Sequence, residues 1–386
     1  PRPFRQPLRA ADAPQAPHTK GTAVANTPTE TLHRAGQSLW LDYITRELVR
    51  SGTLARYIDD LSVTGLTSNP SIFDKAFEGS VDYDDAIRAG ASAGRGDEDL
   101  FFDIAIEDIR AAADLLRPVW ERTDGVDGWA SLEVSPRIAF DTEATSEAAQ
   151  RLHAAVDRPN VFIKIPGTPE GLGAIEESIA HGIPVNVTLL FSAEQYTAQA
   201  EAYLRGIERR VAAGENPAVA SVASVFVSRW DKKVPADAPA HLKDRLGVTV
   251  SQAVYRLYRD LYASDRWSRL VSMGARPQRL LWASTSTKDP ALPDTFYIGA
   301  LASPGTVNTM PEGTLLAFAD HGEVGAMLPR DGGDADAVLA DFRAIGIDQT
   351  EVGQVLQNEG AAAFVDSWES LLGVLQAKTA TLGAAS

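Results

Sequence analysis

One lysine inside a short apolar run is the residue of this chain best suited to covalent chemistry. The run Val161–Pro166 reads Val-Phe-Ile-Lys-Ile-Pro, with Lys164 near its carboxyl end. Such a run is typical of a central parallel strand, which is covered on both faces. Burial disfavours the charged form of an amine, and a neutral amine can form a Schiff base with a carbonyl. The alternative is a strand-end lysine whose ammonium group reaches solvent.

Polar side chains stand near the ends of the other short apolar runs. They are Asp42, Asn69, Glu133, Asn186 with Thr188, Ser224 and Ser284. The steps from Glu133 to Lys164 and from Lys164 to Asn186 are each about the length of one strand–helix unit. Each of these residue types alone also caps helices. As a set, a ring of acids, amides and hydroxyls at successive strand ends is typical of a barrel active site.

The elements that must position these side chains are short apolar runs alternating with amphipathic stretches. The predicted strands are Ser38–Leu41, Val63–Leu66, Gly128–Val134, Val161–Ile165, Pro184–Val187, Ala220–Val227, Arg279–Ala283 and Thr295–Ile298. The predicted helices include Leu100–Leu116, Thr145–Val156, Leu172–Ala180 and Ala193–Ala213. This alternation predicts βαβ units and an α/β fold with a parallel sheet. Eight strands favour a (β/α)8 TIM barrel over an open doubly wound sheet.

Three segments predict helices beyond the basic barrel. Leu48–Asp60 adds helix near the N-terminus, Asp231–Trp267 forms an insertion after the sixth strand, and Glu351–Thr381 forms one or two helices covering the barrel. Residues 1–30 are rich in Pro and Ala and poor in large apolar residues, which predicts a flexible tail. Residues 31–386 are therefore expected to form a single domain.

Composition excludes several kinds of function. The chain has 386 residues, no cysteine and a formal charge of −16. Disulfides, thiolate catalysis and Cys-ligated metals are therefore excluded, and the acidic balance argues against general nucleic-acid binding. The six histidines do not form the cluster of a metal-dependent aldolase. No apolar run is long enough to span a bilayer and no signal core is visible, so we expect a cytoplasmic protein.

The glycines of Gly167–Gly173 follow a predicted strand and open a predicted helix. Their spacing is not the GxGxxG of a dinucleotide site. A turn between a strand and a helix is therefore the favoured interpretation, with nucleotide binding as the alternative.

Several ordered segments resemble the signature motifs of the transaldolases, and the resemblance runs from about Ser38 to about Pro311. The segments are Val63–Phe73, Ser131–Arg137 followed by Phe140-Asp-Thr-Glu-Ala, Ile163–Pro166 and Asn186–Ser192. Trp282–Lys288 and Thr306–Met310 are most similar to the longer bacterial subgroup. The resemblance implies a barrel fold and an aldol transfer that needs neither metal nor cofactor.

The resemblance also implies a reaction. Lys164 would form an imine with a ketose phosphate, and C–C cleavage would release an aldose phosphate. The retained dihydroxyacetone unit would then attack a second aldose phosphate. The implied pair is sedoheptulose 7-phosphate with glyceraldehyde 3-phosphate, giving erythrose 4-phosphate and fructose 6-phosphate in the non-oxidative pentose phosphate pathway.

Roles for the other residues follow from the same resemblance. Asp42 is the expected acid/base, and Glu133 with Thr188 is expected to hold a water beside the lysine. Glu133 also needs a partner for its charge, either Lys164 or Arg137. The remaining substrate contacts are expected from Asn69, Asn186 and Ser224, with Phe226 as an apolar wall.

Phosphate binding departs from the pattern of the shorter family members, which carry Ser-x-Arg after the seventh strand. The corresponding stretch here is Ser284-Thr-Ser286, with no arginine. We expect Lys288, with Arg229 opposite it, to supply the positive charge at the usual barrel phosphate site.

Two other functions stay open at this point. One is a Schiff-base aldolase that releases free dihydroxyacetone, and the other is a non-catalytic sugar-phosphate-binding module. Partners are expected to be sugar phosphates, with neither nucleic acid nor membrane, and the chain to be a monomer or homodimer.

Overall fold

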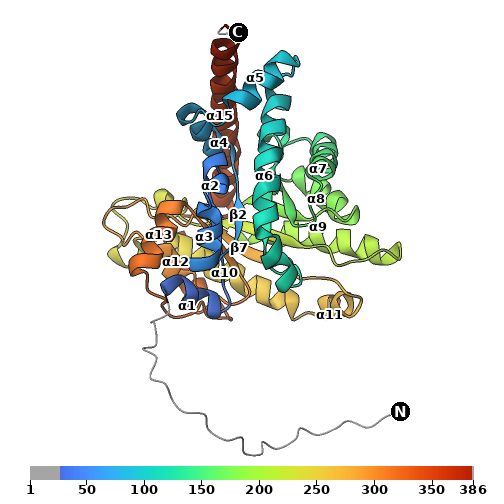
Figure 1. Cartoon of the computed structure of the whole chain (residues 1–386). Helices are drawn as coiled ribbons and strands as arrows, with labels where there is room; N and C mark the ends of the chain where they lie inside the picture. The colour runs from blue at the N-terminus through green and yellow to red at the C-terminus, as the bar shows by residue number, and fades with distance from the viewer. Residues whose placement is uncertain (1–26, 385–386) are drawn as a thin grey trace, which may run out of the picture.

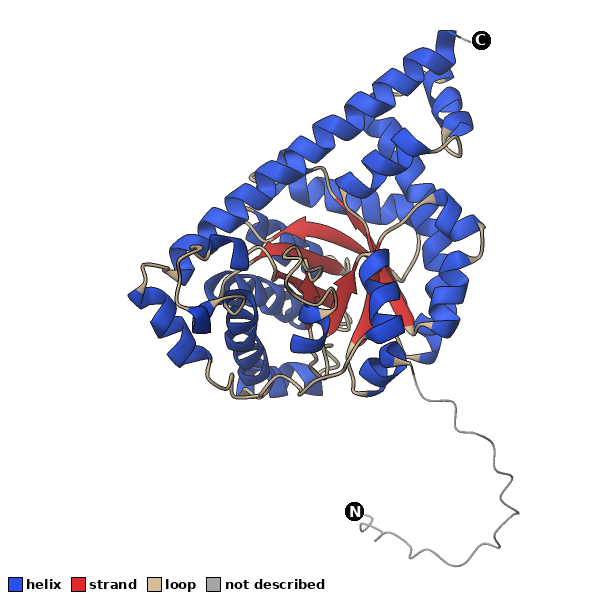
Figure 2. Ribbon diagram, turned by 90° about the vertical axis from the view of Figure 1, so that its left-hand side faces the viewer, coloured by secondary structure: helices blue, strands red, loops and turns tan. Residues whose placement is uncertain are grey.

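Eight parallel strands close into a barrel in chain order, and helices surround it (Figures 1 and 2). The computed structural model describes residues 27–384. The strands are β1 (Ser38–Asp42), β2 (Val63–Thr67), β3 (Trp129–Glu133), β4 (Val161–Pro166), β5 (Val185–Leu190), β6 (Ser221–Phe226), β7 (Arg279–Ala283) and β8 (Val307–Met310). The predicted (β/α)8 barrel is therefore confirmed.

The eighth strand was predicted in the wrong place. Thr295–Ile298 runs into the short helix α12 (Phe296–Ala300), and β8 is Val307–Met310, which pairs with β1 and β7. This strand is short and carries Asn308 and Thr309, so it does not stand out as an apolar run. Both residues are buried: Thr309 is hydrogen-bonded to Thr67 and Asn308 to Thr285.

Helices follow most strands in chain order. They are α1 (Pro28–Arg34), α2 (Arg46–Arg50), α3 (Thr53–Asp60), α4 (Pro70–Gly79), α5 (Asp84–Ser92), α6 (Asp97–Arg122), α7 (Thr142–Val156), α8 (Gly171–Ala180), α9 (Ala193–Ala212), α10 (Leu246–Tyr262), α11 (Asp265–Ser272), α12, α13 (Glu312–His321), α14 (Ala335–Ala344) and α15 (Gln349–Ala384). Three short 3-10 turns complete them: η1 (Pro136–Ile138), η2 (Asp231–Lys233) and η3 (Ala240–Leu242).

The three predicted additions to the barrel are present. The segment 48–60 falls within α2 and α3, and the insertion 231–267 contains η2, η3, α10 and the start of α11. The C-terminal stretch forms one helix, α15. Of the predicted tail, residues 1–26 lie outside the described residues, and α1 begins at Pro28.

Aromatic side chains fill the barrel interior toward the amino ends of the strands. Phe162 stacks on Trp129 at 4.1 Å and lies 6.0 Å from Trp40, measured between ring centroids. Gly65 on β2 makes room for this layer, because a Cβ there would come within 2.6 Å of the Trp40 indole. These rings leave a small cavity of about 90 Å³ at this end, lined by Trp129, Phe162 and Arg279 among others. Active sites of such barrels lie at the carboxyl ends of the strands.

Helix α15 runs from the barrel to a projecting end of the molecule, where α5 and the start of α6 lie beside it (Figures 1 and 2). Its Trp368 packs edge-on against Phe101 at 4.8 Å, and Phe101 in turn meets Phe73 of α4 at 5.3 Å. These aromatic contacts are worth more than their buried area alone. They tie α4, which follows β2, to the C-terminal helix.

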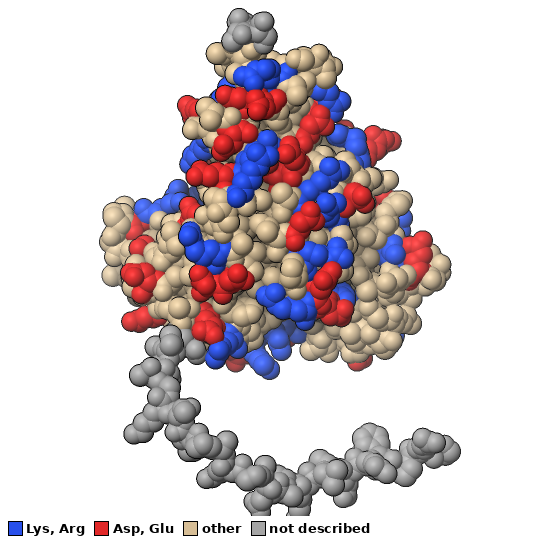
Figure 3. Space-filling model, in the orientation of Figure 1, with Lys and Arg blue, Asp and Glu red and all other residues tan. Residues whose placement is uncertain are grey.

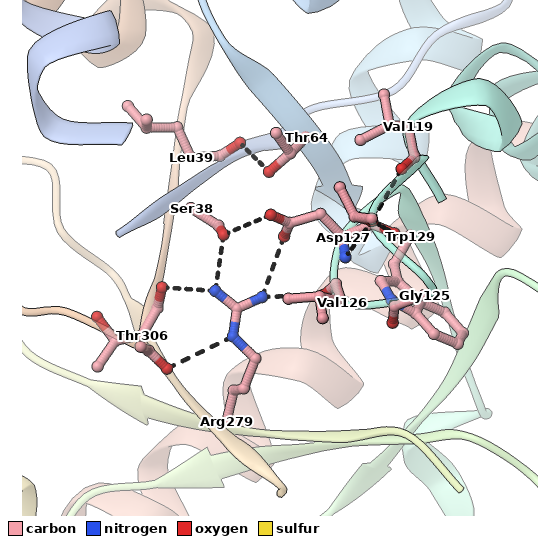
Figure 4. Close-up of polar contacts among 12 residues, drawn as sticks. Ser38, Leu39, Thr64, Val119, Gly125, Val126, Asp127, Trp129, Arg279 and Thr306 are labelled. Carbon is pink, nitrogen blue, oxygen red and sulfur yellow. Dashed lines mark hydrogen bonds and ion pairs between the residues drawn. The ribbon is translucent and has the colours of Figure 1, made fainter. Parts of the chain in front are cut away.

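A polar network closes the barrel at the amino ends of its strands (Figure 4). The Arg279 guanidinium donates to Asp127 Oδ1 at 3.0 Å, to Ser38 Oγ at 2.7 Å and to the Thr306 carbonyl at 2.9 Å. Ser38 in turn donates to Asp127 at 2.8 Å. The network joins β1 and β7 to the segments that lead into β3 and β8, so it stabilises barrel closure at the end remote from the strands' carboxyl ends.

Replacing Arg279 should therefore cost stability and leave chemistry intact. Arg279→Met leaves the buried Asp127 carboxylate unpaired, so the free energy of unfolding should fall by about 3–5 kcal/mol. Urea denaturation measures the loss, and kcat below the transition should match the unmutated protein. Arg95→Met is the control, since the Arg95–Asp103 pair is solvent-exposed and should contribute little. Equal stability of the two variants would contradict this role.

Candidate active site

A cavity of about 530 Å³ opens at the carboxyl ends of the strands. Every predicted site residue except Glu133 and Asn186 lines it. The predicted residues in its wall are Asp42, Asn69, Lys164, Thr188, Ser224, Phe226, Arg229, Ser284, Ser286 and Lys288. Barrel closure thus brings together side chains that are spread over most of the sequence.

Lys164 lies at the floor of this cavity and is only 5% exposed. Its Nζ donates to Glu133 Oε2 at 2.9 Å and to the Ser68 carbonyl at 2.8 Å. The pairing follows from strand register, since Glu133, Lys164 and Asn186 are aligned on neighbouring strands. The alternative of an ammonium group reaching bulk solvent is wrong.

Glu133 is buried beneath the cavity and pairs with Lys164. Burial raises the pKa of the Glu133 carboxyl, and the neighbouring Lys164 charge opposes that rise. Arg137, the other predicted partner, instead pairs with Glu98 and Glu369 near the surface. A carboxyl whose charged form is disfavoured can accept the lysine proton more readily than an exposed one.

Asn186 also lies beneath the cavity wall, fully buried. Its Nδ2 donates to Ser131 Oγ at 3.2 Å, and its Oδ1 accepts from Ser224 Oγ at 2.7 Å. Ser224, unlike Asn186, lines the cavity. The amide therefore orients the Ser224 hydroxyl in this structure.

Thr188 is aimed into the site by an irregularity in β5. The pairing with β6 shifts between Val187 and Leu190, and Leu189 takes a positive φ of 59°. Such bulges redirect side chains next to active sites. Thr188 Oγ1 is buried and has no hydrogen-bond partner among the described residues, so this hydroxyl is free to bind a water or a substrate oxygen.

Asp42 faces Lys164 from the end of β1. Its Oδ1 accepts from Thr67 Oγ1 at 2.7 Å and, more weakly, from Asn69 Nδ2 at 3.5 Å. Burial raises the pKa of Asp42, against the lowering effects of the Lys164 charge and these two donors. Asp42 is therefore poised to accept and return a proton closer to neutral pH than an ordinary aspartate.

Sequence reasoning missed two hydroxyls beside Asp42. Thr67 and Thr309 both line the cavity, and their Oγ1 atoms are hydrogen-bonded at 2.8 Å. Because Thr67 donates to Asp42, the proton between the threonines comes from Thr309. Both residues lie within segments that resemble the transaldolases, Thr67 in Val63–Phe73 and Thr309 in Thr306–Met310. Thr309 was not placed at a strand end because β8 was predicted elsewhere.

The outer part of the cavity is cationic. Lys288 Nζ donates to Ser286 Oγ at 2.8 Å, and the Ser284 hydroxyl bonds Ser228 at 3.0 Å. Arg229 lies over the Phe226 ring at 5.5 Å. Burial lowers the pKa of Arg229. Lys75 of α4 also lines this region and was not predicted from the sequence. The sequence pointed to it only by its position six residues after Asn69.

Other kinds of site find little support. Between residues 27 and 384, no group of three or more His, Asp or Glu side chains is placed to hold a metal ion. The helices of the same range include none with the length and apolar character to cross a membrane.

The glycine-rich segment Gly167–Gly173 serves close packing between a strand and a helix. A Cβ at Gly171 would meet the Pro166 carbonyl at 2.0 Å.

A closed parallel barrel with a polar cavity at the carboxyl ends of its strands is the architecture of a TIM-barrel enzyme. Residues 39–375 match the model of the Transaldolase/Fructose-6-phosphate aldolase family, and the chain belongs to this family.

Curated relatives agree over nearly the whole chain. A transaldolase of Parafrankia sp. (strain EAN1pec) is 46% identical over 90% of this chain and 97% of its own length. Those of Thermobifida fusca (strain YX) and Arthrobacter sp. (strain FB24) are 46% and 44% identical, over 90% and 93% of this chain and 96% and 100% of their own lengths. A solved structure of a putative fructose-1,6-biphosphate aldolase from Coccidioides immitis aligns over 90% of this chain and 97% of its own, at 12% identity and a TM-score of 0.28.

The half-buried carboxylate of Asp42, whose pKa desolvation raises, should make the folded protein less stable as pH rises. A carboxyl whose pKa is higher folded than unfolded binds more protons in the folded state, so stability falls as pH rises through the folded pKa. Asp42→Asn removes this titration. The variant should resist urea better than the unmutated protein at about pH 8, with a smaller gain at about pH 5.

The matched control is Asp103→Asn, at an exposed carboxylate, which should show no such pH-dependent gain. An Asp42→Asn protein that is less stable at both pH values by the same amount would contradict the argument.

Proposed function

We propose that this chain is a transaldolase of the non-oxidative pentose phosphate pathway. It transfers a dihydroxyacetone unit from sedoheptulose 7-phosphate to glyceraldehyde 3-phosphate, giving erythrose 4-phosphate and fructose 6-phosphate, through a Schiff base on Lys164. The names of the curated relatives support this activity. The observation that carries it is a buried lysine between two carboxylates at the floor of a polar cavity, Glu133 buried and Asp42 half-buried.

Imine formation begins when the Lys164 amine attacks C2 of the ketose. Glu133, 2.9 Å from Nζ, takes the proton that the attacking nitrogen must lose. The Thr188 hydroxyl binds the water that carries protons as the carbinolamine dehydrates. The resulting protonated imine is an electron sink.

Cleavage of the C3–C4 bond then needs a base at the C4 hydroxyl. Asp42 takes that proton as the bond breaks, the electron pair moves into the imine, and the aldose phosphate leaves. The retained three-carbon unit attacks the aldehyde carbon of the acceptor, and Asp42 returns the proton to the new hydroxyl. Hydrolysis of the imine frees the product and Lys164.

The remaining residues bind and orient the sugar. Asn69 and Ser224 bind hydroxyl groups, with Asn186 holding Ser224 in place, while Phe226 forms the apolar wall. Ser284, Ser286, Arg229 and Lys288 bind the phosphate. We further propose that residues 31–386 act as one domain in the cytoplasm, as a monomer or homodimer, with sugar phosphates and neither nucleic acid nor membrane as partners.

Borohydride reduction in the presence of fructose 6-phosphate tests the lysine. Peptide mass mapping should find a three-carbon adduct on Lys164 and on no other residue. Lys164→Met should lower kcat/KM by at least about 10³-fold, because it removes the nucleophile. Lys243→Met, at an exposed lysine, should leave turnover unchanged. Normal turnover by Lys164→Met would overturn the Schiff-base role of Lys164, and absence of turnover in the unmutated protein would favour a non-catalytic sugar-phosphate-binding module.

Product analysis separates transfer from simple cleavage. With fructose 6-phosphate alone, little free dihydroxyacetone should form, because the carbanion is held as the imine. Adding erythrose 4-phosphate should give sedoheptulose 7-phosphate. Free dihydroxyacetone as the main product, with or without the acceptor, would instead identify a Schiff-base aldolase.

A further inference from the structure

Helix α4 runs from the part of the cavity that holds Asp42 and Lys164 toward the part that holds Lys288. Its N-cap, Asn69, accepts from the Ile72 amide at 3.2 Å and donates toward Asp42. From there, Ile72, Lys75 and Ala76 recur at helical spacing, and all three line the cavity. With a rise of about 1.5 Å per residue, Lys75 lies roughly 9 Å along the helix axis from Asn69.

Lys75 belongs to a group of four cations that we call the cationic rim: Lys75, Arg229, Lys232 and Lys288. Lys75, Arg229 and Lys288 line the cavity, and the charges of Lys75, Lys232 and Arg229 act on Lys288. Burial and these three charges lower the pKa of Lys288. In the part of the chain that the structure describes, none of the four rim cations lies within ion-pair distance of a carboxylate.

This arrangement is unusual for so acidic a protein. Elsewhere acidic and basic side chains alternate over the surface, as on the face in Figure 3, and many are joined in ion pairs. The formal charge of −16 makes carboxylates abundant. The Glu359 charge acts on Arg229 without forming an ion pair. Four like charges with so little compensation repel one another, and a bound dianion relieves that repulsion.

Packing holds Lys75 at this place. On the side of α4 that faces α15, Ser71 bonds Ser367 at 2.8 Å and Asp74 accepts from Ser370 at 2.9 Å. Phe73 and Phe77 are buried in the aromatic cluster. The neighbouring acid of α4, Asp74, is thus engaged with α15, and the Lys75 backbone cannot move away from the cavity without unpacking the helix.

We propose that Lys75 is a further phosphate-binding residue, which joins Lys288 and Arg229 to replace the missing arginine of the Ser-x-Arg pattern. The proposal rests on the transaldolase function proposed above. Lysine is a point charge on a flexible stem, whereas arginine is a rigid fork. With C2 fixed at Lys164, the phosphates of fructose 6-phosphate and sedoheptulose 7-phosphate lie one carbon apart along the chain. Several point charges around the rim accept both positions.

Lys75→Met tests this binding role. The KM for both ketose phosphates should rise about 10-fold while kcat changes little, because one charge-assisted contact is lost. Competitive inhibition by inorganic phosphate should weaken by a similar factor. Lys75→Arg retains a cation and should recover most of the affinity, and Lys243→Met should behave like the unmutated protein.

Trapping with dihydroxyacetone and borohydride provides a phosphate-free readout. Labelling of Lys164 by dihydroxyacetone should be the same in Lys75→Met and the unmutated protein, whereas labelling by limiting fructose 6-phosphate should fall. An unchanged KM and unchanged phosphate inhibition in Lys75→Met would overturn the role of Lys75 alone. A fall in kcat without a change in KM would also overturn it. Absence of dihydroxyacetone labelling in the unmutated protein would overturn the proposed function itself.

Discussion

The contact between Lys164 and Glu133 is the constraint around which the site is built. Both side chains are almost fully buried, so each charge has lost most of its hydration, and their mutual attraction must offset that loss. An apolar pair of the same volume would stabilise the barrel at least as well. The ion pair is explained by the proposed chemistry, because it places a proton acceptor 2.9 Å from the Lys164 nitrogen at the cavity floor.

The amino ends of the strands contribute mainly to stability, whereas the carboxyl ends hold the candidate active site. At the amino ends of the strands, Trp129 stacks on Phe162, and the Arg279 network pairs the buried Asp127 carboxylate. At the carboxyl ends, burial raises the pKa values of Asp42 and Glu133, and Thr188 Oγ1 has no partner within the described residues. Polar groups that are poorly satisfied in the free protein are available to substrate atoms. The packed end supplies the stability that such a site lacks.

The sequence predicted the barrel and most of the site because strands buried on both faces are short apolar runs, and a polar residue at the end of such a run stands out. Lys164 is the clearest case. The same rule failed at β8, where Asn308 and Thr309 are polar yet buried and bonded to Thr285 and Thr67. The same rule could not show that Asn186 lies below the cavity wall, because the position of a residue along its strand does not tell whether its side chain reaches the surface of a pocket. Lys75 was not predicted for another reason. Packing against α15 sets which face of α4 lines the cavity, and that packing cannot be read from the sequence near Lys75.

Charge orders the cavity from floor to mouth. At the floor the Lys164 charge is paired with Glu133, with Asp42 beside them. The floor therefore carries no excess positive charge, and it suits a neutral ketone and its hydroxyls. The rim holds cations, and those from α4 and from the segments after β6 and β7 line the cavity itself. In the proposed reaction, a phosphorylated ketose has one favourable orientation in this field, with its phosphate outward and C2 toward Lys164. Binding energy at the phosphate then holds the reacting carbon against the amine, which is how contacts remote from the bond being broken contribute to its cleavage.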